Sequence, residues 1–309
     1  MKKFFIIYLS LFIVMTTFGK GYLVQSPNGK LKITVDAGNT LTWQIQYQGK
    51  AVLQPSAMSV DIGSDVLGKN VKVKRAMVKR IRESFSTPVY KKATVTDQYT
   101  LLVLSCKDGY DVEFRAYDDG AAYRFVINRY VDKVCSEQVE LCFSDDHHAF
   151  IPYVNSRKED RYGTSFESFY DEQRLSEMYP DSLVLLPMAV CLPDGMKAVL
   201  MEAGVRDYPG LFVKKGGKNS LIGEHAPYVL EDHPVNRNLV PIKRASYIAN
   251  GCSGSLPWRV VLVTERDAQL LDNDMAQRLS EPCKIEDVSW IKPGLVAWDW
   301  WNNTNVTGV

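Results

Sequence analysis

The stretch Asp111-Val-Glu-Phe-Arg-Ala-Tyr-Asp-Asp-Gly-Ala-Ala-Tyr-Arg-Phe-Val126 has the pattern of a β-hairpin. Apolar and polar side chains alternate on both sides of Asp-Asp-Gly120, a composition typical of tight turns. Arg115 and Arg124 lie on opposite arms, where they either grip a ligand or pair with Glu113 and neighbouring acids. We favour the pairing, because cross-strand charge pairs stabilise a sheet. The hairpin therefore predicts two adjacent antiparallel strands.

The same alternation recurs on both sides of this hairpin, with polar connections that contain Gly, Pro, Asn or Asp. One helix is expected, beginning at Thr264 as N-cap and ending before Pro282. Many strands joined by short connections favour a large antiparallel sandwich over a parallel α/β sheet. The sequence predicts strands at 30–36, 41–47, 58–62, 71–73, 93–106, 110–117, 121–131, 138–143, 149–153, 183–191, 197–202 and 259–263.

Residues 1–19 have the pattern of a secretory signal peptide. A basic start (Met1-Lys2-Lys3) precedes an apolar run from Phe4 to Met15, and Gly19 is a small residue at the expected cleavage site. The apolar run is shorter than the roughly 20 residues that span a bilayer, so a retained anchor is the less favoured alternative. We expect an exported, periplasmic protein that makes no membrane contact after signal cleavage.

Charge and cysteine content restrict the function classes. The chain has 37 basic and 36 acidic side chains, so a nucleic-acid partner, which calls for a basic excess, is not expected. The six cysteines show no Cys-x-x-Cys pair and no small disulfide framework. Cys106, Cys142 and Cys191 lie in apolar runs and are expected to be buried thiols, with a Cys135–Cys142 bridge as the alternative. The four histidines lack zinc-ligand spacing.

A polar loop covers residues 155–167 and carries three oxygen donors, Glu159, Asp160 and Glu167. Calcium takes six to eight oxygen ligands, so this loop is insufficient to form a complete site by itself. From the residues alone we expect a solvated loop.

The C-terminal end contains an acid within an aromatic strand, Trp298-Asp299-Trp300-Trp301. An unpaired buried carboxylate is costly, so Asp299 is either a turn cap beside Asn302 or a group that binds substrate at the end of a barrel strand. The residues leave both alternatives open. Such a strand needs neighbours, and we expect the chain to be the front part of a longer protein.

Several segments, in this order and spacing, resemble glycoside hydrolase family 97. The resemblance implies an exported bacterial α-glycosidase with an N-terminal β-super-sandwich, a central (β/α)8 catalytic barrel and a C-terminal β-domain. It places residues 22–290 in the super-sandwich and residues 291–309 in a linker and the first strand of a truncated barrel. The segments are Ser26-Pro-Asn-Gly-Lys-Leu31, Phe114–Phe125, Ala149-Phe-Ile-Pro152, Leu256–Val263, Leu279–Ile285, Ser289–Pro293 and Trp298–Trp301.

The resemblance also implies roles for single residues. Family members use calcium, held by barrel glutamates and one glutamate of the N-terminal domain, which by position falls on Glu159. The Trp298-Asp299-Trp300-Trp301-Asn302 form looks more like the retaining α-galactosidase branch. There Asp299 would accept hydrogen bonds from galactose hydroxyls, with Trp298 and Trp300 beside it in the substrate site. The catalytic carboxylates lie on later barrel strands, so no catalytic residue carries over.

The resemblance therefore implies the N-terminal portion of a calcium-dependent, retaining α-galactosidase whose substrate is an α-galactoside or oligosaccharide. The 309-residue chain alone is expected to be inactive. An inverting α-glucosidase of the same family is one alternative, and a non-catalytic carbohydrate-binding sandwich is the other.

Overall fold

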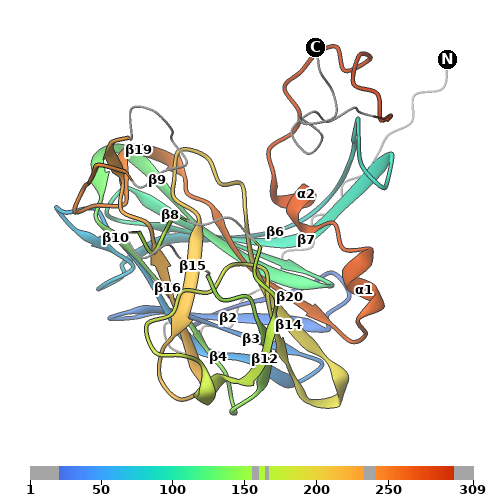
Figure 1. Ribbon diagram of the computed structural model, residues 1–309, viewed down its shortest axis with the longest axis horizontal. Coiled ribbons are helices and arrows are strands. Elements are labelled where there is room, and N and C mark those ends of the chain that lie inside the picture. Colours follow the sequence, from blue (N-terminus) through green and yellow to red (C-terminus); the bar gives the residue numbers. More distant parts are fainter. Residues whose placement is uncertain (1–20, 155–159, 164–166, 233–240, 296–309) are drawn as a thin grey trace, which may run out of the picture.

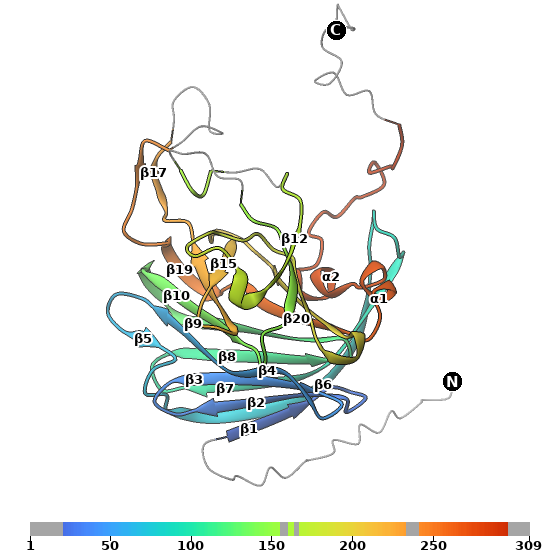
Figure 2. The same ribbon diagram turned by 60° about the horizontal axis from the view of Figure 1, so that its bottom comes forward.

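The computed structural model describes residues 21–154, 160–163, 167–232 and 241–295. Two large antiparallel β-sheets, one of eight and one of ten strands, pack face to face (Figure 1). β1 packs against β7, and β2 packs against β8 and β9, which brings the two sheets into contact (Figure 2). The mostly β, antiparallel sandwich expected from the sequence is confirmed. Within the described residues, neither helix is long and apolar enough to cross a membrane.

The eight-stranded sheet has the order β1-β2-β3-β4-β10-β16-β15, with β5 paired to β4. Its strands are β1 (Gly21–Gln25), β2 (Leu31–Ala37), β3 (Leu41–Tyr47), β4 (Lys50–Asp61), β5 (Val66–Leu67), β10 (Ser136–Cys142), β15 (Leu211–Lys215) and β16 (Ser220–His225).

The ten-stranded sheet has the order β12-β11-β13-β14-β20-β9-β8-β7-β6, with β19 paired to β9. Its strands are β6 (Val73–Ser86), β7 (Thr94–Cys106), β8 (Tyr110–Tyr117), β9 (Gly120–Val134), β11 (His148–Ile151), β12 (Asp171–Arg174), β13 (Met188–Cys191), β14 (Lys197–Ala203), β19 (Ala249–Ser255) and β20 (Trp258–Thr264). A separate ribbon and four short helical turns complete the described structure: β17 (Val229–Glu231), β18 (Lys243–Arg244), α1 (Ala268–Leu271), α2 (Met275–Leu279) and the 3-10 turns Leu175–Glu177 and Pro193–Gly195.

The predicted hairpin is β8–β9, with Glu113 opposite Arg124 and Tyr117 opposite Gly120. The expected ion pair is present, with Arg124 Nε 2.7 Å from Glu113 Oε2. Gly120 is required by close packing, because a Cβ there would lie 2.8 Å from the Val261 carbonyl oxygen of β20. The turn therefore serves both the hairpin and the contact with the neighbouring strand.

The main core lies between the two sheets. Alternate residues of β2 and β3 are buried, so each strand turns one face inward. The rings of Trp43, from the first sheet, and Tyr123, from the second, meet edge to face at 4.8 Å. Burial of each such large side chain contributes about 1.5–3 kcal/mol, so these contacts hold the layers together.

Several local predictions need correction. The expected helix from Thr264 is wrong, because Thr264 ends β20 and is buried, and the helical segment divides into α1 and α2. Asn273 separates them, and its side-chain oxygen accepts a hydrogen bond from the Met275 N–H. The strand expected at 71–73 overlaps β6 at Val73 alone, since β6 continues to Ser86, and the strand expected at 183–191 is limited to β13. The predicted barrel strand from Leu295 falls almost wholly outside the described residues.

All six cysteines are free thiols, so the alternative Cys135–Cys142 bridge is not formed. Cys106 is buried as expected, and burial raises the pKa of its thiol to about 11. Cys142 and Cys191 are only half-buried, so the prediction of full burial is wrong for these two.

Candidate functional site

The polar loop near residue 160 is held by an ion pair with the β17–β18 ribbon. Asp160 is buried, and its Oδ2 lies 2.6 Å from Arg244 Nη2, while its Oδ1 accepts a hydrogen bond from the Tyr162 N–H. Arg244 also donates to the Pro227 carbonyl oxygen. The sequence-based expectation of a solvated loop is therefore wrong at Asp160, which is an anchor.

A second anchor of the same loop is Glu224 on β16. Its carboxylate accepts a hydrogen bond from the Tyr162 hydroxyl at 2.7 Å and lies 2.5 Å from Lys214 Nζ and 3.5 Å from Arg161 Nη2. Burial alone would raise the pKa of Glu224, but the bonds from Lys214 and Tyr162 outweigh it and lower the pKa. Burial and the bond to Glu224 together raise the pKa of Tyr162 to about 12. Glu224 thus remains a carboxylate at neutral pH.

The residues predicted as ligands are distributed unevenly around this loop. Glu159, the expected calcium ligand, lies outside the described residues, immediately before the anchored Asp160, and Glu167 is exposed. The residues predicted to bind substrate, Trp298, Asp299 and Trp300, also lie outside the described residues. Across the described chain, no group of three or more His, Cys, Asp or Glu side chains is arranged to hold a metal ion.

A buried ion network joins the two sheets. Arg259 of β20 donates two hydrogen bonds to Glu137 of β10, from Nε to Oε1 at 2.8 Å and from Nη2 to Oε2 at 2.6 Å. Its Nη1 lies 2.7 Å from Glu202 Oε2, and the Tyr208 hydroxyl donates to Glu137 at 2.9 Å. His225 Nε2 lies 3.1 Å from Arg259 Nη2. The network connects β14 and β20 to β10 and β16.

Burial sets the protonation states in this network. Burial alone would raise the pKa of Glu137, but the charge and hydrogen bonds of Arg259 outweigh burial and lower this pKa. Burial lowers the pKa of His225 to about 4, so its ring is neutral at pH 7. Burial raises the pKa of Glu202 against the opposing effect of Arg259. Because Arg259 and Glu137 are sealed from solvent, we assign the network a structural role as a clamp between the sheets.

This clamp was not predicted from the sequence. The available signal was a charged residue, Arg259, within the otherwise apolar strand Trp258–Val263, since such a residue needs a buried partner. The partner, Glu137, is more than 100 positions away and belongs to the other sheet, so spacing alone did not point to it.

The outer face of the ten-stranded sheet carries a second polar cluster. The Arg115 guanidinium lies between the rings of Tyr99, at 4.3 Å, and Trp258, at 4.7 Å. Arg124 lies over Trp258 at 4.3 Å. Asp97 lies 3.5 Å from Arg115, and burial raises the pKa of its carboxyl to about 6. Both arginines are therefore engaged in ring stacking and ion pairs within the sheet. This agrees with the sequence-based preference for pairing over ligand binding.

The tip of the β6–β7 hairpin holds the α1–α2 turn against this outer face. Lys92 Nζ lies 2.6 Å from Asp274 and 2.9 Å from Asp272, and the Tyr90 hydroxyl donates to Asp274 at 2.8 Å. Lys91 Nζ donates to backbone carbonyls of the same turn. We call these contacts the hairpin latch. It fixes the segment that leads away from the sandwich.

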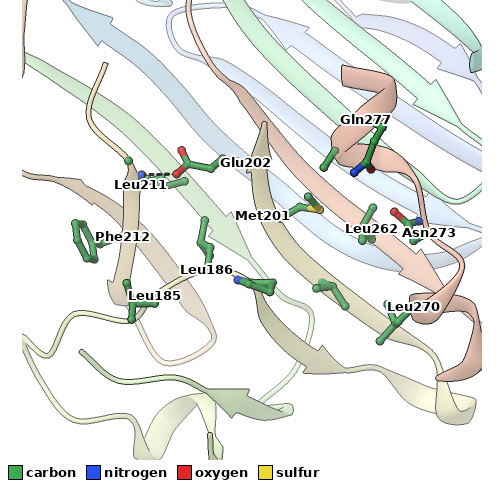
Figure 3. Close-up of a pocket in the computed structure, with 14 residues that line it drawn as sticks. Leu185, Leu186, Met201, Glu202, Leu211, Phe212, Leu262, Leu270, Asn273 and Gln277 are labelled. Carbon is green, nitrogen blue, oxygen red and sulfur yellow. Dashed lines mark hydrogen bonds between the residues drawn. The ribbon is translucent and has the colours of Figure 1, made fainter. Parts of the chain in front are cut away.

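A pocket of about 510 Å³ lies between β14, β20, the α1–α2 segment and residues 210–212 (Figure 3). Its polar groups are partly engaged, since Glu202 accepts the Leu211 N–H and Asn273 donates to Asp119. Sugar hydroxyls require several hydrogen-bonding groups, so we do not assign the sugar site to this mostly apolar pocket. The apolar lining consists of Leu185, Leu186, Pro187, Val199, Met201, Leu211, Phe212, Leu262, Leu270 and Ala276.

Comparison with known proteins gives a consistent family. The family model described as Glycosyl-hydrolase 97 N-terminal matches residues 24–282. A retaining alpha-galactosidase of Bacteroides thetaiotaomicron is 37% identical over 303 residues, which is 94% of this chain and 46% of that protein. A probable retaining alpha-galactosidase of Streptomyces bingchenggensis is 22% identical and covers 89% of this chain and 40% of that protein. The chain thus spans less than half the length of these relatives.

Solved structures share the fold. A glycoside hydrolase family 97 enzyme from Pseudoalteromonas sp. strain K8, in complex with acarbose, superposes with a TM-score of 0.71 at 23% identity, over 88% of this chain and 40% of that one. A beta-arabinopyranosidase gives 0.66 at 20% identity, over 79% and 40%. Since the family model covers most of the sandwich described above, the chain belongs to glycoside hydrolase family 97 and contains its N-terminal domain.

Proposed function

We propose that the protein is the N-terminal part of an exported, retaining α-galactosidase. The observation that carries this proposal is the 37% identity over 303 residues to a retaining alpha-galactosidase. The solved structures, at 20–23% identity, support the fold only. In this proposal the sandwich supports a catalytic barrel, and the catalytic carboxylates belong to later parts of the protein.

The chain's own contribution is a positioned loop. Asp160 is engaged by Arg244 and Tyr162 by Glu224, so the loop is anchored at both of these residues. We infer that this anchoring holds the preceding Glu159 where it supplies one carboxylate to a calcium ion shared with the barrel. Bound calcium would supply a positive charge near the substrate. The described residues do not form the six to eight oxygen ligands by themselves, which fits a site shared between domains.

For the substrate, the proposal assigns Asp299 as the acceptor of galactose hydroxyls, with Trp298 and Trp300 beside it. A carboxylate that accepts two hydroxyl hydrogen bonds binds strongly and with defined direction. The N-terminal residues 1–19 are proposed to direct export to the periplasm.

The test compares two proteins with nitrophenyl α-galactoside as substrate: the 309-residue chain, and the product of the reading frame continued past codon 309. We expect turnover by the longer protein and none by the 309-residue chain, because retaining hydrolysis needs two carboxylates about 5 Å apart. Turnover by the 309-residue chain would refute the assignment of the chemistry to later residues.

The alternatives give different results in the same assay. Preferential hydrolysis of nitrophenyl α-glucoside with inversion would identify an α-glucosidase. A stop codon at position 310, together with glycan binding by the stable chain, would identify a non-catalytic binding module.

A further inference from the structure

β6 is the outermost strand of the ten-stranded sheet, because β7 is its neighbour on one side and the sheet order ends there. It is fourteen residues long, and eleven of its residues are exposed. Figure 1 shows the β6–β7 hairpin extending away from the sandwich toward the α1–α2 segment. Even Met77 and Val78, in the middle of the strand, are 38% and 39% exposed. The strand therefore presents a long, open edge to solvent.

Positive charge is concentrated on this edge. Six cationic side chains occur within eleven residues, and the nearest acid along the strand is Glu83, just beyond them. The whole chain, in contrast, is nearly neutral. We call the six exposed side chains the β6 basic line: Lys72, Lys74, Arg75, Lys79, Arg80 and Arg82.

The side chains of the basic line form no ion pair with the described part of the chain. The ion pairs of the described residues include Lys91 and Lys92 at the tip of the same hairpin, but none of the six members of the line. The adjacent strand β7 carries one charged residue, Asp97, which is buried and paired with Arg115. Lys72, just before the strand, lines a surface hollow together with Asp61, Asp65 and Asp108. The other five form a row one strand wide without ion-pair partners among the described residues.

The geometry of an edge strand determines what this row can contact. Strands rise about 3.3 Å per residue, so the line from Lys72 to Arg82 extends over about 33 Å. Successive side chains point to opposite faces of the sheet; Lys79 is opposite Leu101 and Arg80 opposite Thr100. A ligand that approaches the edge along the strand therefore meets cations from both faces.

A narrow row of cations fits a linear polyanion. A membrane surface is flat and would be matched by a broad basic face, whereas β7 adds no cation to widen the row. Single-stranded nucleic acid is bound with exposed, stacking aromatic side chains, and the one aromatic residue of β6, Phe85, is half-buried and beyond the basic line. We propose that the β6 basic line binds a linear, carboxylate-bearing polysaccharide. Binding at this edge is independent of hydrolysis, so its failure would leave the proposed glycosidase function intact.

The test measures binding of polygalacturonate to the chain by affinity electrophoresis, at low and at physiological ionic strength. The variant carries Lys74→Gln, Arg75→Gln, Lys79→Gln and Arg80→Gln. A matched control carries Arg129→Gln, Lys218→Gln, Lys243→Gln and Lys292→Gln, four exposed cations outside the line. We expect the line variant to lose about tenfold in affinity at low salt and to show a weaker salt dependence, since fewer counterions are released. The control should change by less than about twofold, as scattered surface charges act through a screened field.

Three outcomes would overturn the proposal. Equal loss in the line variant and the control would show that only net charge matters. Unchanged polygalacturonate binding, combined with edge-to-edge dimerisation of the line variant in sedimentation, would show that the cations protect the open edge from pairing. Stronger binding to single-stranded DNA or to phosphatidylglycerol vesicles than to polygalacturonate would assign the line to another class of partner. The thermal unfolding of each variant checks that the fold is intact.

Discussion

Removal of Arg259 tests whether the buried clamp holds the two sheets together. The substitution Arg259→Leu keeps an apolar stem in the core but leaves the Glu137 carboxylate with the Tyr208 hydroxyl as its remaining hydrogen-bond donor in the clamp. Loss of one partner from a buried ion pair costs about 3–5 kcal/mol, and both arms of Arg259 bind Glu137 here. We expect a loss of about that size in the free energy of unfolding. Urea titration followed by tryptophan fluorescence measures it.

The pH dependence of the free energy of unfolding provides a second, independent test of the clamp. In the native protein Arg259 lowers the pKa of Glu137, so its stabilisation is present above the ordinary glutamate pKa and is lost as pH falls through the lowered value. In Arg259→Leu the largest effect that opposes burial is gone and only the Tyr208 hydrogen bond and His225 still act against it, so the pKa of Glu137 rises and the carboxyl is protonated more readily. The deficit of the variant should therefore be smaller at pH 4 than at pH 7. In the native protein, protonation of His225, whose pKa is lowered to about 4, removes stability as pH falls from the unfolded value of about 6.5.

The double variant E137Q/R259L removes both charges and should recover part of the lost stability, because the uncompensated charge is gone. An exposed arginine provides the control: Arg129→Leu should change the free energy of unfolding by less than about 0.5 kcal/mol. A loss below about 1 kcal/mol for Arg259→Leu, or a double variant less stable than the single one, would refute the clamp.

Three further predictions address the turn, the latch and the metal. Gly120→Ala should cost about 1–3 kcal/mol in urea unfolding, because its Cβ would meet the Val261 carbonyl oxygen at 2.8 Å, whereas Gly294→Ala, with open space around it, should be neutral. Asp274→Asn removes the charge that holds Lys92 and should speed proteolysis within residues 264–282, with Asp287→Asn as the control; equal cleavage rates would contradict the latch. In the longer protein, Glu159→Gln should raise the calcium concentration needed for half-maximal thermal stabilisation by about tenfold or more, since one ligand is lost. If Glu167→Gln has that effect instead, the loop ligand is Glu167.

The sequence predicted the sheets better than the contacts between them. Strict alternation in 30–36 and 41–47 identified β2 and β3, because one face of each is buried. β6 was missed except for Val73, since its cationic residues 74–82 show no apolar alternation and its pairing is set by β7. The helix after β20 was misplaced because Thr264 has the residue type of an N-cap, while its position in the fold is the end of a buried strand.

In the candidate site, too, the sequence revealed local features but not the contacts between distant residues. The loop acids at 159–167 were recognised as oxygen donors, but the role of Asp160 depends on Arg244, which lies 84 positions later. The clamp depends on Glu137 and Arg259 meeting across the two sheets. Such pairs are products of the sheet topology, so local patterns in one sequence do not reveal them.

The most direct test of the central claim is the configuration of the first-formed sugar. The protein extended past codon 309 is mixed with nitrophenyl α-galactoside, and the anomeric proton of the released galactose is followed by nuclear magnetic resonance before mutarotation. A retaining α-galactosidase releases α-galactose first, and this is the result we predict. Release of β-galactose first, or absence of hydrolysis by the calcium-loaded longer protein, would contradict the account.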